Sequence, residues 1–361
     1  MELHKISDEG GGVRFVLLDR RMRLVKPVNV YLEYQQLRGR AENTLKAYAQ
    51  DLKTFFSFLE QKELCFEDVN APMIQAYIEY LRSPGGSVGV IYAESKRTAN
   101  TINRMVGTIY GFYCYQSAVN GIRNPIATVL SGNSSGVFRD MLYHTRKSNR
   151  TKQSVFTVKK SNYQIHLFTA DEIQAMYSML PTVRDRLIFK FLLQSGARIS
   201  EVLSLKIEDI PVPDFSNPIA VLHGIQSKGK RRDIYIPTEL AAELDNYVFE
   251  HRLLVKAEHN CLFTSQHPHQ KNRPISYRGL YEVFKRAGSK AGIDFKFHDT
   301  RHTFITRLVE SGMDFSVVRI LAGHEHISTT QKYVTLSTKF ISGSLAAYWA
   351  SVMPEGGDFN E

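Results

Sequence analysis

The amino-acid sequence predicts a mainly α-helical protein of two domains, the second of which is mixed α/β, mostly helical, with a small antiparallel sheet. The chain has 361 residues, of which 43% are apolar, enough for two ordinary hydrophobic cores. Apolar residues recur at helical spacing through most of both halves. Residues 219–236 change to the alternating period of strands, which adds the small sheet.

The first domain is predicted over residues 26–130, after an N-terminal extension of residues 1–25. One helix has an apolar face at spacings of three and four, formed by Leu45, Tyr48, Leu52, Phe55, Phe56 and Leu59. Further helices are predicted over residues 73–81, which a Ser-Pro-Gly-Gly stretch ends, and over residues 98–118. We therefore expect a small helical bundle.

Residues 131–165 have the composition of a basic interdomain linker. The stretch opens with small and polar residues typical of loops. Against one acid, Asp140, it carries seven basic residues, namely Arg139, Arg146, Lys147, Arg150, Lys152, Lys159 and Lys160. Such a segment can lie on phosphates or can be a solvated charged loop, and charge alone does not decide between the two.

The second domain is predicted over residues 166–340. Thr169 and Glu172 have the spacing of a capping box, which begins a helical stretch that reaches about residue 204. The alternating pattern of residues 219–236 predicts a hairpin with Ser-Lys-Gly-Lys at its turn. Helices return over residues 239–249, 276–291, 298–311 and 315–322. A C-terminal tail, residues 341–361, has an apolar stripe of Ile341, Leu345, Tyr348, Trp349 and Val352.

The composition indicates the partner and the compartment. Lys and Arg number 46 against 36 Asp and Glu, a net charge of +10 that favours a polyanion such as nucleic acid, although many basic proteins bind none. Three cysteines, none in a C-x-x-C pair, suggest neither disulfides nor a thiolate zinc site and fit a reducing cytosol. We expect neither secretion nor membrane spanning, because the sequence lacks a leader-like start and a long apolar run.

Two segments hold candidate catalytic residues. Arg198 follows a glycine at a predicted helix start, and Glu201 three residues later can hold its guanidinium, although such a pair is more often structural. His298 and Arg301 lie one helical turn apart, while His298 and His302 have a spacing that also suits zinc. The metal alternative needs further ligands, for which His324 and Glu325 are candidates.

Together these segments resemble the tyrosine recombinase (phage integrase) family. GARISE at 196–201 resembles the family's first arginine box and HDTRHT at 298–303 its H-x-x-R box. LAGH at 321–324, followed by STTQKY at 328–333, resembles the final box, with Tyr333 at the expected distance. Lys228 resembles the hairpin lysine of the family. In the first domain, NTLKAY at 43–48 resembles the first helix of the core-binding domain.

The resemblance implies a fold, an activity and partners. Residues 26–130 would be the helical core-binding (SAM-like) domain, and residues 166–340 the catalytic domain. The activity would be that of a site-specific DNA recombinase, an integrase or transposase that cleaves and rejoins strands through a 3′-phosphotyrosyl intermediate to integrate and excise a mobile element. The partners would be double-stranded DNA, further copies in a tetramer joined through the tail, and other proteins of the element. We expect no cofactor, no metal and no membrane, in the bacterial cytoplasm at the nucleoid.

The resemblance also assigns roles to residues. Tyr333 would attack phosphorus, with Arg198, Arg301 and His298 activating it and, with His324, stabilising the charge that develops. Lys228 would protonate the 5′ oxygen that leaves, and Glu201 would orient Arg198 or His298 without reacting. The expected DNA contacts are Lys46, Lys96, Arg97 and Arg104 in the first domain and Arg146, Lys147, Arg150 and Lys152 in the linker.

Three alternatives remain open. A type IB topoisomerase would use the same chemistry but rejoin the same strand. A DNA-binding regulator could keep these residues as vestiges, since residues 314–324 can form half of a helix-turn-helix. A metal-dependent nuclease would use His298, His302 and His324 as ligands.

Overall fold

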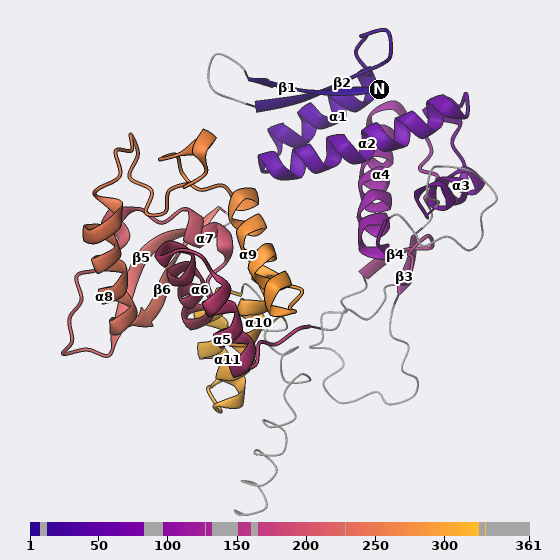
Figure 1. Ribbon diagram of the computed structural model, residues 1–361. Helices are drawn as coiled ribbons and strands as arrows, with labels where there is room; N and C mark the ends of the chain where they lie inside the picture. Colours follow the sequence, from indigo (N-terminus) through magenta and orange to yellow (C-terminus); the bar gives the residue numbers. More distant parts are fainter. Residues whose placement is uncertain are drawn as a thin grey trace, which may run out of the picture. The chain divides into compact units, whose positions relative to one another are not determined.

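The computed structural model describes residues 1–7, 13–82, 97–126, 128–131, 151–159, 165–227, 229–324 and 329. The chain divides into two compact units, Met1–Tyr163 and Gln164–Glu361 (Figure 1). Each unit has its own hydrophobic core. Within the described ranges, no helix combines the length and the apolar composition needed to cross a membrane.

Helices dominate the first unit, as predicted. They are α1 (Lys26–Leu37), α2 (Glu42–Gln61), the 3₁₀ turn η1 (Phe66–Asp68), α3 (Ala71–Arg82) and α4 (Ala99–Asn120). The face predicted for the α2 region is buried except at Tyr48, which is half-buried, and its Phe55 meets Tyr77 of α3 edge to face, with ring centroids 5.1 Å apart. The Thr98 side chain caps α4 by accepting a hydrogen bond from the Thr101 amide.

Residues 1–25, predicted as an extension, form part of the first core. β1 (Glu2–Ser7) and β2 (Val13–Leu18) pair antiparallel, and Phe15 and Leu17 of β2 are buried against the helices. The Asn29 side chain fixes β2 to α1, because its Oδ1 accepts from the Leu17 amide at 2.8 Å and its Nδ2 donates to the Leu17 carbonyl at 3.0 Å. Within and beside the predicted linker, β3 (Thr128–Ser131) and β4 (Thr151–Ser154) form a second short antiparallel pair. Neither strand pair was predicted from the sequence.

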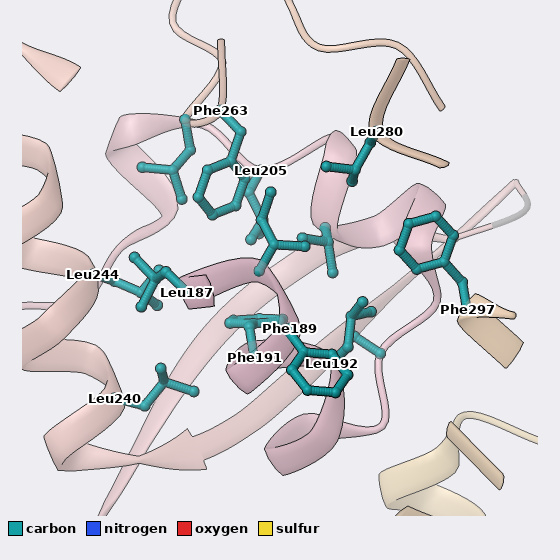
Figure 2. Close-up of a cluster of buried hydrophobic side chains, with 14 of the residues drawn as sticks. Leu187, Phe189, Phe191, Leu192, Leu205, Leu240, Leu244, Phe263, Leu280 and Phe297 are labelled. Carbon is teal, nitrogen blue, oxygen red and sulfur yellow. The ribbon is translucent and has the colours of Figure 1, made fainter. Parts of the chain in front are cut away.

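The second unit combines helices with one two-stranded sheet, as predicted. Its elements are α5 (Ala170–Met179), α6 (Val183–Ser195), α7 (Ile199–Leu203), η2 (Ile207–Asp209), β5 (Ile219–Ser227), β6 (Lys230–Pro237), α8 (Thr238–Tyr247), the π-turn η3 (Val248–Arg252), η4 (Pro268–Gln270), α9 (Tyr277–Ala291), α10 (Phe297–Glu310) and α11 (Phe315–Ala322). The predicted capping box at Thr169 and Glu172 begins α5. Figure 2 shows the core, in which α6 supplies Leu187, Phe189, Phe191 and Leu192.

The β5–β6 hairpin brings the end of β5, at Ser227, to the start of α7 at Arg198. Its register shifts between Leu222 and Ile225, where Gly224 has a φ of +63°. Asp233 on β6 accepts a hydrogen bond from the Gly224 amide at 2.9 Å and so stabilises this bulge. Beyond the bulge, Ser227 pairs with Lys230.

Candidate active site

The backbone at the end of α6 determines where Arg198 lies. Gly196 ends the helix with a φ of +59°, in the left-handed region that favours glycine. A Cβ built on Gly196 would lie 2.2 Å from Cδ1 of Phe304 on α10, so no larger residue fits. Two residues later Arg198 is the N-cap of α7 and begins a new helix at this close approach.

Glu201 holds Arg198 from the first turn of α7. This carboxylate is fully buried, and it accepts from the Arg198 amide at 2.8 Å and from Arg198 Nη1 at 2.9 Å. It also accepts from Arg232 of β6, with Nε 3.1 Å from Oε1 and Nη2 2.7 Å from Oε2. Burial alone would raise the pKa of Glu201, but the hydrogen bonds and charge of Arg232, with further hydrogen bonds, hold that pKa at about 2. Glu201 is therefore an anion shared by two guanidiniums.

Three arginines bind the end of α11. Arg232 Nη1 donates to the Leu321 carbonyl at 2.8 Å, Arg301 Nη2 donates to the Ala322 carbonyl, and Arg198 Nη2 donates to the Gly323 carbonyl at 3.1 Å. The last carbonyls of a helix have no partner within it and carry partial negative charge, which suits them to cations. This arginine triad, Arg198, Arg232 and Arg301, fixes the chain immediately before His324.

Arg301 and Arg198 also meet other elements. Arg301 is buried on α10 and donates from Nη1 to the Gly196 carbonyl at 2.8 Å. Arg198 Nη1 donates to Oγ of Ser227, at the end of β5, at 3.0 Å. The site is thus assembled from α6, α7, the hairpin, α10 and α11.

The histidines of the site lie among these cations. The rings of His298 and His302 are 4.4 Å apart between centroids. Burial, with the charges of neighbouring groups, lowers the pKa of His302 to about 4. Burial, followed by the charges of Arg301 and Arg198, lowers the pKa of His324 to about 4 as well. Near pH 7 His324 is therefore neutral and has one ring N–H to donate.

Comparison with known proteins decides the family. Residues 166–339 match the model described as "Phage integrase family", and residues 28–118 match "Phage integrase, N-terminal SAM-like domain", together more than half of the chain. The chain belongs to the phage integrase family of tyrosine recombinases. The recombinase therefore has the fold that its sequence predicted, a SAM-like domain followed by a catalytic domain.

Relatives of the recombinase span nearly its full length. Transposase A from transposon Tn554 of Staphylococcus aureus is 28% identical over 343 residues, 92% of this chain and 94% of the relative. The length and layout of this chain resemble that type of protein. Tyrosine recombinase XerD of Staphylococcus haemolyticus is 26% identical over 325 residues, 86% of this chain and 94% of the relative.

Solved structures share the fold. The XerH site-specific recombinase, in a post-cleavage complex with its palindromic difH substrate, aligns with a TM-score of 0.60 at 18% identity, covering 87% of this chain and 82% of that one. The Tn1549 transposon integrase bound to circular intermediate DNA aligns with a TM-score of 0.61 at 17% identity, covering 89% of this chain and 99% of that one.

Four residues that the sequence predicted for the site lie together in the structure, and two others fall outside the described residues. Arg198, Glu201, Arg301 and His324 meet around the end of α11, and His298 lies on α10 one turn from Arg301. Lys228 and Tyr333 lie outside the described residues, so their roles stay predictions. Among the described residues, no group of three His, Cys, Asp or Glu side chains is arranged to hold a metal ion, and Glu325 is not among them.

The predicted DNA contacts divide in the same way. Lys46 is exposed on α2, Arg97 is half-buried before α4, and Arg104 pairs with the buried Asp51 at 2.5 Å. Lys96, Arg146, Lys147 and Arg150 lie outside the described residues, as does the side chain of Lys152 on β4.

Arg232 of the catalytic domain was not among the residues predicted for the site. A signal for it exists, because successive side chains of a strand point to opposite faces. Ile234 and Ile236 are buried, and Arg232 continues their inward face two residues earlier, whereas Arg231 is exposed. An arginine on the buried face of a strand needs an anionic or carbonyl partner, which here is Glu201.

Proposed function

We propose that this recombinase cuts and rejoins double-stranded DNA at specific sites through a covalent bond between Tyr333 and a 3′ phosphate, and so integrates and excises a mobile element. The observation that carries the proposal is the arrangement of Arg198, Arg301 and His324 around the end of α11. Attack on phosphorus places negative charge on the nonbridging oxygens, and fixed cationic donors stabilise such charge most strongly when they need not rearrange.

Arg198 has donors to offer a phosphate. Three of the five N–H groups of a guanidinium are engaged by Glu201, Ser227 and the Gly323 carbonyl in the part of the chain that the structure describes. Its side chain is 24% exposed, and we expect the two remaining N–H groups to be available to a phosphate of bound DNA. A neutral His324, with its lowered pKa, adds one N–H donor.

The chemical step follows from these donors and the two undescribed residues. The Tyr333 phenol gives its proton to a neighbouring base, for which His298 is the candidate, and its oxygen bonds to phosphorus while the bond from phosphorus to the 5′ oxygen breaks. Lys228 gives a proton to that leaving oxygen. The product is a 3′-phosphotyrosyl ester and a free 5′ hydroxyl. Because the ester keeps the energy of the broken bond, the hydroxyl of another strand reverses the step without ATP.

The first unit offers a surface for the DNA backbone. A groove of about 580 Å³ among α1, α2 and α4 is lined by Arg38, Arg40 and Arg104 with tyrosines that include Tyr48. Basic and aromatic side chains in one groove suit contacts with phosphates and sugars. We assign DNA binding to this groove and to Lys46, with the basic linker as an added clamp.

Assembly on DNA completes the proposal. Exchange of strands between two sites needs four cleavage centres, and we propose a tetramer in which residues 341–361 of each copy dock on the next. The tail lies outside the described residues, and its apolar stripe is the reason to expect a docking partner. Other proteins of the element would choose the direction of the reaction.

A joining assay tests this function. A plasmid carrying both ends of the encoding element, incubated with the recombinase in excess EDTA, should release a circle whose junction joins the two ends. Sequencing of that junction identifies the exchanged strands. Relaxation of supercoils without new junctions would instead support the topoisomerase alternative, and a requirement for added zinc or magnesium would support the nuclease.

A further inference from the structure

We propose that Arg232 is a positioning residue for catalysis, which aligns Arg198 and His324 with the phosphate. The proposal rests on the proposed function and adds a group that the sequence motifs do not include. Arg232 lies on β6, four residues after Lys228 in the sequence, and its side chain bonds to Glu201 of α7 and to the Leu321 carbonyl of α11.

The first path of influence is through Glu201. Arg232 binds both carboxylate oxygens of Glu201, side on, while Arg198 binds the same carboxylate from the other direction. A buried carboxylate is costly unless it is paired and hydrogen-bonded, and two guanidiniums satisfy it better than one. Without Arg232, Glu201 would hold its charge less firmly and would fix Arg198 less well.

The second path is through the chain before His324. Arg232 Nη1 binds the Leu321 carbonyl, and the aliphatic part of its side chain lies under Gly323, where a built Cβ would approach Cδ to 2.7 Å. Gly323 has a φ of +60°, which turns the chain out of α11 and into His324. Arg232 therefore supports the turn from which His324 projects.

The geometry also explains why an arginine is needed. The side chain is only 13% exposed and makes three hydrogen bonds in fixed directions, to Oε1 and Oε2 of Glu201 and to the Leu321 carbonyl. A lysine ammonium is a single compact charge and cannot reproduce a planar fork that reaches both partners. We therefore expect Arg232→Lys to keep part of the function and Arg232→Met to lose most of it.

The test is single-turnover cleavage of a nicked DNA substrate at saturating protein, so that binding and cleavage are measured apart. Arg232→Met should bind DNA within a few-fold of wild type but cleave about 100-fold more slowly, because small misplacements of reacting groups have effects of that size. Arg232→Lys should fall between. Arg231→Gln removes the same charge from the exposed face of the same strand and should cleave at the wild-type rate.

Two readouts separate positioning from a merely structural role. A substrate with sulfur in place of the 5′ bridging oxygen has a leaving group that needs no proton, so it should restore cleavage to Lys228→Met but not to Arg232→Met. Loss of Arg232 should also raise the pKa of Glu201, so cleavage by Arg232→Met should decline as the pH is lowered below neutrality, more steeply than wild type.

Several results would overturn the proposal. Wild-type cleavage rates in Arg232→Met, loss of DNA binding alone, or rescue by the sulfur substrate would each show that Arg232 does not act through Arg198 and His324. If Arg232→Met does not fold, as judged by its thermal unfolding, Arg232→Lys decides through the same rate and pH profile. Absence of any covalent adduct in wild type would instead refute the proposed function.

Discussion

Arg198 and Arg232 share one carboxylate oxygen of Glu201, with Arg198 Nη1 at 2.9 Å and Arg232 Nε at 3.1 Å from the same Oε1. The two arginines come from different elements, α7 and β6, and both continue to the last carbonyls of α11. One buried anion therefore couples the position of Arg198, which we propose binds the phosphate, to the turn that carries His324.

Glu201→Gln should destabilise the second unit by about 3 kcal/mol, because it removes one member of a buried charge network and turns an amide N–H towards a guanidinium. Denaturant unfolding measures the loss. Glu243→Gln is the matched control, since Glu243 forms an ion pair with Lys190 at 43% exposure and should change stability by less than about 1 kcal/mol. Equal losses of stability in the two variants would contradict the conclusion that Glu201 is the buried anion that stabilises the arginines around it.

The same carboxylate should make stability depend on acidity. The pKa of Glu201 is held at about 2, below its ordinary 4.5, so its contribution is full above pH 4.5 and is lost as the pH falls through about 2. The unfolding free energy of wild type should therefore decrease as the pH is lowered from 4.5 to about 2. In Glu201→Gln the unfolding free energy should depend less steeply on pH over this range. Parallel pH curves for the two proteins would show that the charge of Glu201 is not stabilised by folding.

Gly196→Ala should impair both stability and cleavage. The new Cβ would meet Phe304 at 2.2 Å on a backbone with a φ of +59°. Gly292→Ala is the control, because Gly292 ends α9 with a φ of +73° and has open space for a Cβ. The control should lose about 1–2 kcal/mol from backbone strain alone. Gly196→Ala should lose more stability than the control and also cleave slowly, since Arg198 lies only two residues later. Equal losses of stability in the two variants, with normal cleavage by Gly196→Ala, would contradict the close packing of Gly196 against Phe304.

Charge removal in the groove of the first unit should flatten the salt dependence of DNA binding. Arg38→Gln with Arg40→Gln should reduce the log-log slope by about 0.9 for each phosphate that the protein no longer neutralises. Arg20→Gln with Arg21→Gln removes two charges from the turn after β2 and should leave the slope unchanged. Binding isotherms over a range of salt concentrations measure the slope for each double variant. If both double variants reduced the slope equally, the effect would come from overall charge and not from the groove.

The sequence predicted most of the helices because their apolar faces repeat clearly, as in α9 and α11, and it predicted the β5–β6 hairpin from alternation. It did not predict that β2 joins the first core, although Val13, Phe15 and Leu17 alternate, because six residues form too short a signal beside longer helices. Periodicity also cannot show which backbone carbonyls a side chain will bind.

The candidate site was predictable where motifs are local and not where contacts are distant. Glu201 and Arg198 lie three residues apart, so their pairing could be expected. Arg232 reaches Glu201 across 31 residues, through the register of a hairpin that only the folded chain defines. The roles of Lys228 and Tyr333 rest on the sequence motif and remain to be tested.

The most direct measurement of the central claim is covalent trapping on a nicked substrate, from which the strand released by cleavage diffuses away. Wild type should form an SDS-resistant adduct, and mass spectrometry of its proteolytic fragments should place the nucleotide on Tyr333. Tyr333→Phe should bind the same DNA normally and form no adduct. An adduct that persists in Tyr333→Phe, or a nucleotide found on another residue, would contradict the account.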